Sequence, residues 1–257
     1  MAKRPHQVEH VAPGVARLGD ESVNFYLVEA PEGLVLVDAG LPGHRGQAEA
    51  HLARDGRTFA DVKAVLLTHG HPDHTGLAAT AQDAGADIWI HEADAPILAD
   101  GPRSAMRHAK PERPMISYVL RRPSAFAGPL HMARLGGFTA GPVTGVRTFD
   151  AEQRLDAVPG RPQVVPLPGH TPGAVAYHFP DLGVLFTGDA LVTRDGLTGH
   201  KGPCLVARGF THDTAAALAS LDRLDTLPAA TVLPGHGPAF PDGPTAATDQ
   251  ARKYGLH

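Results

Sequence analysis

Residues 68–76 constrain the fold more than any other part of this chain of 257 residues. They read Thr-His-Gly-His-Pro-Asp-His-Thr-Gly and place three imidazoles and one carboxylate within six positions. Pro72 has no N–H group and the glycines disfavour a helix, so a tight loop is expected here. The segment predicts a metal-binding loop; the alternative is a polar surface loop that happens to be rich in histidine. The four candidate ligands are His69, His71, Asp73 and His74.

Apolar strands are predicted to bring this loop and three later polar residues to one place. The run from Val62 to Leu67 is apolar at every position except Lys63, as expected of a strand that is mostly buried on both faces, and it stops where the histidine cluster begins. Three later strands each end in a loop with one metal-competent residue, namely His170, Asp189 and His236. In layered α/β proteins sites gather where strand ends converge, so all these residues are expected to lie together.

Strands and helices are expected to alternate along most of the chain, which is typical of an α/β architecture. Helices are predicted at 46–54, at 77–84 and, with Thr211 or Asp213 as the N-cap, at 211–227. The stretch from about 96 to 145 differs, with scattered Pro and Gly, many basic residues and two short predicted helices at 104–109 and 115–122. The predicted strands are 8–18 with a break at Pro13-Gly14, 24–28, 34–37, 62–67, 87–91, 163–167, 174–179, 184–187 and 231–233.

Composition argues against several classes of protein. Hydrophobic residues make up 42% and charged residues 19%, as in ordinary soluble globular proteins. The net charge of −4 gives no basic field that would draw the chain to nucleic acid or an anionic membrane. Residues 1–6 are not followed by an apolar run, so no signal peptide is expected. The single cysteine, Cys204, excludes an internal disulfide framework and fits a reducing compartment. We expect a cytoplasmic protein without nucleic-acid or membrane partners.

The order of the polar residues resembles that of the metallo-β-lactamase fold superfamily. Its signature is His-x-His-x-Asp-His followed by single His, Asp and His residues at later strand ends, and all are present here. The resemblance runs from about Val8 to Gly237 and leaves only 96–145 unmatched. It implies an α/β fold that is a four-layer αββα sandwich of two similar halves, with metals at one edge between the sheets. We expect 1–257 to form a single domain in which 96–145 is a substrate lid.

The resemblance also implies how the ligands divide. One metal would be held by His69, His71 and His170 and a second by Asp73, His74 and His236, with Asp189 bridging the two. Zinc is expected, with iron and manganese as alternatives. Two metal ions ~3.5–4 Å apart can share a hydroxide, lower the pKa of water and polarise the substrate oxygen. The candidate catalytic residues are Asp73, placed to orient the hydroxide, and His236.

Other polar residues have weaker assignments. Four polar residues near the loops could orient the imidazoles by hydrogen bonds, or could simply make the hydrogen bonds that are ordinary in turns, and the sequence favours neither explanation. They are Thr68, Thr171, Asp38 and Asn24. His91 is favoured as a structural histidine. Cys204 is favoured as a small packed residue over a nucleophile.

Two positions narrow the reaction within the superfamily. His71 stands where the diiron flavoprotein branch has Glu, and Asp189 stands where the lactamases have Cys or Ser. A bridging Asp is similar to the thioesterase, lactonase and phosphodiesterase branches. The stretch 202–210 matches the glutathione-binding loop of glyoxalase II only loosely, and 190–193 lacks the Tyr of the acyl-homoserine lactonases. Neither of these named activities follows from the residues.

The insertion is the expected specificity element. Its basic side chains suit a lid that receives an acyl chain or ring and binds a carboxylate or phosphate. A solvated basic face and a homodimer contact are the alternatives. Between 103 and 122 the basic residues are Arg103, Arg107, Lys110, Arg113, Arg121 and Arg122, against the single acid Glu112.

The sequence therefore predicts a dinuclear metal hydrolase of a small ester, thioester or lactone, with an anionic substrate as one interpretation of the basic lid. A metal-dependent phosphodiesterase is the first alternative. A mononuclear iron enzyme like the persulfide dioxygenases is disfavoured, because His74 and His236 complete a second site. A non-catalytic metal-binding protein is disfavoured by the full set of ligands.

Overall fold

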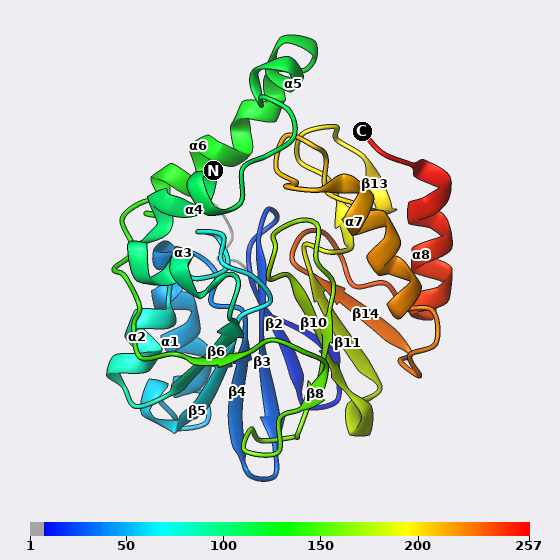
Figure 1. The fold of residues 1–257 in the computed structure, drawn as a ribbon. Helices are drawn as coiled ribbons and strands as arrows, with labels where there is room; N and C mark the ends of the chain where they lie inside the picture. The colour runs from blue at the N-terminus through cyan, green and yellow to red at the C-terminus, as the bar shows by residue number, and fades with distance from the viewer. Residues whose placement is uncertain (1–7) are drawn as a thin grey trace, which may run out of the picture.

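Two β-sheets pack face to face in the computed structural model, which describes residues 8–257 (Figure 1). The first sheet runs antiparallel from β1 to β4 and parallel from β4 to β7. Its strands, in spatial order, are β1 (Glu9–Ala12), β2 (Val15–Gly19), β3 (Asn24–Ala30), β4 (Gly33–Val37), β5 (Val62–Leu66), β6 (Asp87–His91) and β7 (Arg147–Phe149).

The second sheet has five strands, of which the edge pair is parallel and the others are antiparallel. In spatial order they are β14 (Thr231–Pro234), β11 (Val184–Gly188), β10 (Val175–Phe179), β9 (Gln163–Pro166) and β8 (Gln153–Arg154). A separate two-stranded sheet joins β12 (Val192–Arg194) to β13 (Lys201–Cys204). The strands predicted from the sequence are all present, with ends within one or two residues, whereas the short strands β7, β8, β12 and β13 were not anticipated.

Alternation along the strands builds a core on each side of each sheet. In β4, Val35 and Val37 point into the core between the sheets, while Leu34 and Leu36 point into the core beneath the helices. Successive strand residues face opposite sides, so a strand that is apolar at every position must be covered on both. The inner core takes Tyr177 and other large side chains from the second sheet.

Helices cover the outer face of both sheets. On the first sheet lie α1 (Arg45–Ala53), α2 (Ala78–Asp83) and α3 (Ala95–Asp100), and on the second lie α7 (Thr214–Ser220) and α8 (Gly243–Tyr254) (Figure 1). The order helix, sheet, sheet, helix is the αββα sandwich that the resemblance implied, and the prediction of fold class is confirmed.

The predicted helix at 211–227 was too long. Asp213 caps α7 by accepting a hydrogen bond from the Ala216 N–H, whereas the Thr211 hydroxyl donates to a carbonyl elsewhere. The α-helix ends at Ser220, and a 3₁₀ turn follows. This tighter turn aligns residues three apart and so buries both Leu221 and Leu224. Helices α3 and α8 were not anticipated; α8 buries small residues such as Ala247 and Ala251, which give only a weak apolar pattern.

The 96–145 segment is mostly helical and reaches both halves of the sandwich. The short helices predicted there correspond to α4 (Ala105–His108) and α5 (Ile116–Arg121), and α6 (Ala127–Arg134) was missed. On one side, the Gly43 N–H donates to the Leu135 carbonyl at 2.9 Å. On the other, the Arg113 N–H donates to the Arg208 carbonyl at 3.1 Å. In Figure 1, α5 stands away from the body at the top.

Two expectations concern membranes and secretion. Among the helices of residues 8–257, none is long and apolar enough to span a bilayer. The expectation that residues 1–6 begin no signal peptide falls outside the described residues.

His178 on β10 makes the stability of the fold depend on pH. Its side chain is buried, and burial lowers its pKa from the ordinary value of 6.5, against a smaller opposing effect of the Pro228 carbonyl. Below that ordinary value the unfolded chain takes up a proton that the native chain resists, so stability falls as pH falls. We expect His178→Leu to reduce the loss of unfolding free energy between pH 7 and pH 5, measured by urea denaturation. At pH 8 His178 is neutral in both the folded and the unfolded chain. A difference in unfolding free energy between the variant and the unchanged protein at that pH therefore reports packing alone. An unchanged slope would contradict this role of His178.

Candidate metal centre

Four strand-end loops converge at one edge of the sandwich. The first follows β5 and carries the cluster from His69 to His74, and it is a loop rather than a helix, as predicted. It folds back on itself, because the His74 N–H donates to the His71 carbonyl at 3.0 Å. Gly76 is needed at its end, since a Cβ there would lie 2.6 Å from the Gly40 carbonyl oxygen. The loops after β9, β11 and β14 bring the remaining three residues, namely His170, Asp189 and His236.

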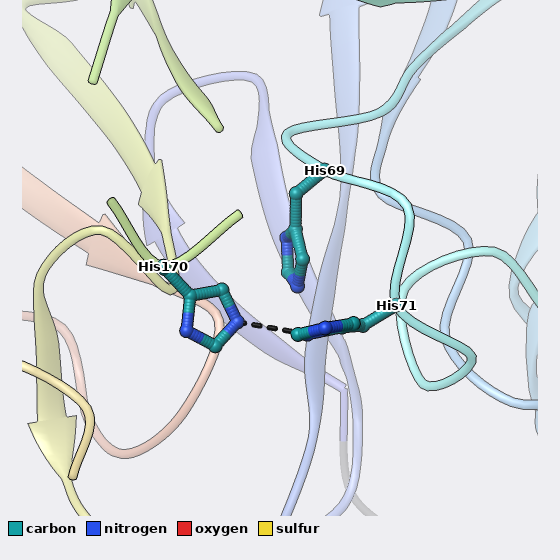
Figure 2. A group of neighbouring side chains, drawn as sticks. All are labelled: His69, His71 and His170. Atoms are coloured by element: carbon teal, nitrogen blue, oxygen red, sulfur yellow. Dashed lines mark hydrogen bonds between the residues drawn. The ribbon is translucent and has the colours of Figure 1, made fainter. Parts of the chain in front are cut away.

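All seven residues proposed as ligands are brought together, in overlapping groups. In each group the potential ligand atoms lie within 4.8 Å of one another. Figure 2 shows the first group, with three imidazole rings facing a common point and His71 Nδ1 only 2.8 Å from His170 Nε2. The groups are His69, His71 and His170; Asp73, His74 and His236; and His69, His74 and Asp189.

Asp189 contacts members of both three-residue sets. Its Oδ2 lies 3.0 Å from His236 Nε2 and 3.5 Å from His170 Nε2, and its Oδ1 lies 3.4 Å from His74 Nε2. Oδ2 thus lies between one member of each set, and a carboxylate in this position could bridge two ions. Asp73 lies at the side of the cluster, with Oδ2 3.5 Å from His236 Nε2.

Several of these buried atoms have no hydrogen-bond partner among residues 8–257. They are His69 Nε2, His74 Nε2 and Asp189 Oδ1 within the cluster, and His170 Nδ1 on the side of its ring away from His71. An unpaired buried polar atom costs about 1–3 kcal/mol, so a cluster of them needs a further partner. Imidazole nitrogen and carboxylate oxygen are the donor atoms that zinc and similar divalent ions bind. The residues present therefore fit a metal centre.

The first set is held in the form that binds metal. Burial lowers the pKa of His69 and His170 well below the ordinary value, and the neighbouring imidazoles lower it further. Burial also lowers the pKa of His71. Neutral imidazole, with a free lone pair, is the form that binds a metal ion.

The second set attracts positive charge. Burial lowers the pKa of His74, but the carboxylates of Asp189 and Asp38 outweigh it and raise the pKa to about 10. His236 behaves in the same way, and Asp189 raises its pKa to about 9. These carboxylates would favour a divalent cation for the same reason that they favour protons on the two imidazoles, and binding a cation would release those protons.

Asp38 and Thr68 orient two of the imidazoles. His74 Nδ1 donates to Asp38 Oδ2 at 2.9 Å, which leaves Nε2 facing the cluster. The Thr68 hydroxyl donates to Asp38 at 2.9 Å and lies 3.1 Å from His69 Nδ1. Asp38 itself has a positive φ of 58°, an uncommon conformation for a residue other than glycine. The sequence left two explanations open for Asp38 and Thr68, namely ordinary turn hydrogen bonding and orientation of the imidazoles. The geometry favours orientation of the imidazoles.

Asn24 acts on the backbone of the last loop, and the remaining candidates lie outside the cluster. The Asn24 side chain donates to the carbonyls of Pro234 and Gly237, on either side of His236, at 2.9 and 2.7 Å. His91 is the last residue of β6, and its Nε2 lies 3.2 Å from the Asp150 carbonyl oxygen. Cys204 is fully buried, and burial raises its pKa to about 12, so its thiol is a packed group rather than a nucleophile.

Asp94 is a supporting residue that the sequence interpretation missed. It is fully buried, and its Oδ2 accepts from the Gly70 N–H at 2.8 Å and the Thr171 hydroxyl at 2.7 Å. Its Oδ1 accepts from the Gly173 N–H at 2.8 Å. One carboxylate thus joins the loop of His71 to the loop of His170. Asp94 follows the end of β6, so the rule used for the other strand ends would have found it.

Comparison with known proteins agrees with this geometry. The family model of the metallo-beta-lactamase superfamily matches residues 18–236. The chain is 28% identical over 245 residues to the probable metallo-hydrolase YflN of Bacillus subtilis, covering 88% of this chain and 84% of that protein. It is 29% identical over 148 residues to the hydroxyacylglutathione hydrolase GloC of Haemophilus influenzae, covering 57% and 58%. A solved structure, TTHA1623 in a di-iron-bound form, superposes with a TM-score of 0.61 and 30% identity over 90% of this chain and 96% of that one.

The role of Asp94 is testable by Asp94→Asn. The amide keeps one acceptor oxygen but places an NH₂ group against donors, so at least one hydrogen bond to the two loops is lost. We expect metal affinity to fall about 10- to 100-fold, as for other residues that orient metal ligands. Competition with a chromogenic chelator measures the affinity, and Asp83→Asn on the exposed end of α2 is the control. Equal affinities for the two variants would show that Asp94 does not support the centre.

Proposed function

The chain is a metallo-hydrolase of the metallo-β-lactamase superfamily, and on this premise we propose that it cleaves a small ester, thioester or lactone with two metal ions. The observation that carries the proposal is the pair of three-residue ligand sets joined by Asp189, with buried donor atoms that lack partners within the described chain. A single-metal enzyme would need only one of the two sets. The similar protein TTHA1623 was solved in a di-iron-bound form, which supports two ions here.

We assign the ligands as the geometry groups them. The first ion would take His69, His71 and His170, and the second would take Asp73, His74 and His236, with Asp189 between them. Zinc suits this donor set of imidazoles and carboxylates, and iron or manganese would also be bound by it. When bound, the two ions supply Lewis acidity and lower the pKa of the attacking water.

The protein's own residues would position the water and exclude bulk solvent. His69, His74 and His170 form the buried floor of the centre, whereas Asp73 and His236 are partly exposed, with side chains 11% and 21% accessible. Substrate therefore approaches from the side of Asp73 and His236. Asp73 Oδ2 would hold the proton of the attacking water and pass it to the leaving group. His236, whose Nε2 lies 3.5 Å from Asp73 Oδ2, would hold the second ion beside Asp73 and so act on the reaction as a ligand.

The 96–145 insertion is proposed as the lid of a single domain spanning 1–257. It comes close to the centre through His212, whose N–H donates to the His170 carbonyl and whose Nδ1 lies 3.0 Å from the Lys110 carbonyl. Its basic side chains would recognise an anionic group of a small-molecule substrate. Its exposed apolar side chains, Leu120 above all, would contact an acyl chain or a second copy of the protein. No nucleic acid or membrane partner is proposed.

Thioesters are supported as one substrate class and phosphodiesters as the alternative. GloC, by its name, hydrolyses hydroxyacylglutathione, which is a thioester, and the match to GloC covers little more than half of each chain. The stretch 202–210 remains only a loose match to a glutathione-binding loop. The alternative rests on charge, because residues 101–145 hold seven Lys or Arg and one acid, and phosphate is bound by such groups.

Ligand replacement tests the proposed reaction. We expect His71→Ala and Asp189→Ala each to lower kcat by more than about 100-fold, because loss of a ligand exceeds the effect of losing a supporting residue. Chelation of metal should abolish activity of the unchanged protein, and zinc should restore it. The measurement is hydrolysis of chromogenic esters, lactones, thioesters and bis(p-nitrophenyl) phosphate, with circular dichroism to verify folding.

The matched control is His91→Ala, which removes a histidine at the end of β6, outside the cluster. It should leave kcat unchanged. Full activity in both ligand variants would show that the centre is misassigned. Turnover of the phosphodiester alone would favour the alternative substrate class.

A further inference from the structure

Asp20 is a buried carboxylate, outside the ligand set, that joins three separate segments. It lies in the loop between β2 and β3, and its side chain is 2% accessible. Oδ1 accepts hydrogen bonds from the N–H groups of Ser22 at 2.7 Å and Val23 at 3.1 Å. Oδ2 lies 3.1 Å from His44 Nε2 and 2.6 Å from His131 Nε2. Because a buried carboxylate is stable only when its lone pairs are used, each of these partners matters.

The two histidines differ in what they attach to Asp20. His44 belongs to the body of the fold, and its Nδ1 accepts from the Leu41 N–H, so Nε2 carries the proton that it donates to Asp20. His131 belongs to α6 of the 96–145 insertion. The same end of α6 is held by the hydrogen bond from Gly43 to Leu135. The Asp20–His131 contact is thus where the insertion reaches the β2–β3 loop.

The β2–β3 loop in turn touches a proposed metal ligand. The His236 ring donates from Nδ1 to the Ser22 carbonyl, and this fixes the tautomer that leaves Nε2 facing Asp189 and Asp73. The backbone of His236 is held separately, by the Thr193 N–H at 3.0 Å. The bond to Ser22 therefore governs the orientation of the ring and not the path of the chain. The Val23 N–H, which lies in the same planar peptide group as the Ser22 carbonyl, donates to Asp20 Oδ1, so Asp20 sets where that carbonyl points.

We propose that Asp20 and His131 are positioning residues that couple the 96–145 insertion to the orientation of His236. The coupling path runs from His131 to Asp20, through the Ser22–Val23 peptide, to the imidazole of His236. While α6 is seated, Asp20 has its full set of partners and the Ser22 carbonyl is fixed. Movement of α6 away removes one imidazole from Oδ2 and loosens the loop that orients His236. The inference rests on the proposed function only where it concerns metal.

The first experiment needs no metal and tests the path itself. In the metal-free full-length chain, hydrogen exchange of the 20–24 peptide is compared between the unchanged protein and His131→Ala. We expect exchange there to become about tenfold faster, because the Ser22 and Val23 N–H groups donate to a less firmly held carboxylate. His131→Gln, whose amide N–H can still donate to Asp20, should restore much of the protection. Unchanged exchange in a folded His131→Ala variant would overturn the proposal.

The second experiment measures metal release with a chromogenic chelator in the zinc-loaded protein. We expect His131→Ala to release one zinc ion per chain about 10- to 100-fold faster and to leave the other unchanged, because only the set that contains His236 is affected. The coupling would be contradicted if both ions were released faster to the same extent, or if neither ion were released faster. If the unchanged protein holds fewer than two ions, the proposed function fails, and the hydrogen-exchange result still decides the coupling.

The insertion offers a matched control in His108, which pairs with the exposed Asp100 at 2.8 Å. His108→Ala removes the same kind of His–Asp contact from the same segment but has no path to His236, and it should change neither measurement. A double-mutant cycle completes the test. In an Asp20→Ala background, His131→Ala should have no further effect on metal release, because the path is already broken. Additive effects of the two substitutions would show that His131 acts in another manner.

Discussion

The structure depends on holding seven histidine and aspartate side chains close together although several of their buried polar atoms have no hydrogen-bond partner within residues 8–257. Three neutral imidazoles face one another, and Asp189 has an unpaired buried oxygen. The sandwich supports this arrangement by packing two sheets around one apolar core, so that the ends of β5, β9, β11 and β14 meet at one edge. The cost of the unpaired atoms is offset elsewhere in the fold until an ion is bound.

Carboxylates outside the ligand set supply the rest of the support. Asp38 orients His74, Asp94 joins the loops of His71 and His170, and Asp20 acts on His236 through Ser22. All three are buried, and all three follow the end of a strand. Asp38 and Asp94 both act on the loop from His69 to His74, Asp94 also on the loop of His170, and Asp20 on the loop between β2 and β3. This division explains how loops far apart in sequence hold one geometry.

Much of the architecture could be predicted because local pattern and global fold agree. Strand β5 is buried at every position except Lys63 and ends at Leu66, shortly before His69, and that one segment indicated both a buried sheet and a site at the ends of its strands. Helix α8 was not predicted, although its buried positions have helical spacing, because they are filled by Pro244, Ala247, Thr248 and Ala251, which are less apolar than leucine or isoleucine. The length of α7 was wrong because burial of Leu221 and Leu224 favours a 3₁₀ turn over the continued α-helix.

The site was predictable in its ligand types and in part of its support. Spacing along the chain identified His69 to His74, and position at a strand end marked Asp38 and would have marked Asp94. The contacts of Asp20 join residues from distant segments and leave no local pattern. The partners of the insertion are likewise visible only in three dimensions. Sequence therefore indicates the chemistry, and the structure adds how the lid segment and the ligands are connected.

The most direct measurement is anomalous X-ray scattering from crystals of the zinc-loaded protein. We expect two peaks per chain, one bound by His69, His71 and His170 and the other by Asp73, His74 and His236. Asp189 should lie between them, with metal–nitrogen distances of about 2.0–2.1 Å. A single peak, or two peaks bound by other residues, would contradict the central claim that this chain holds a two-metal centre.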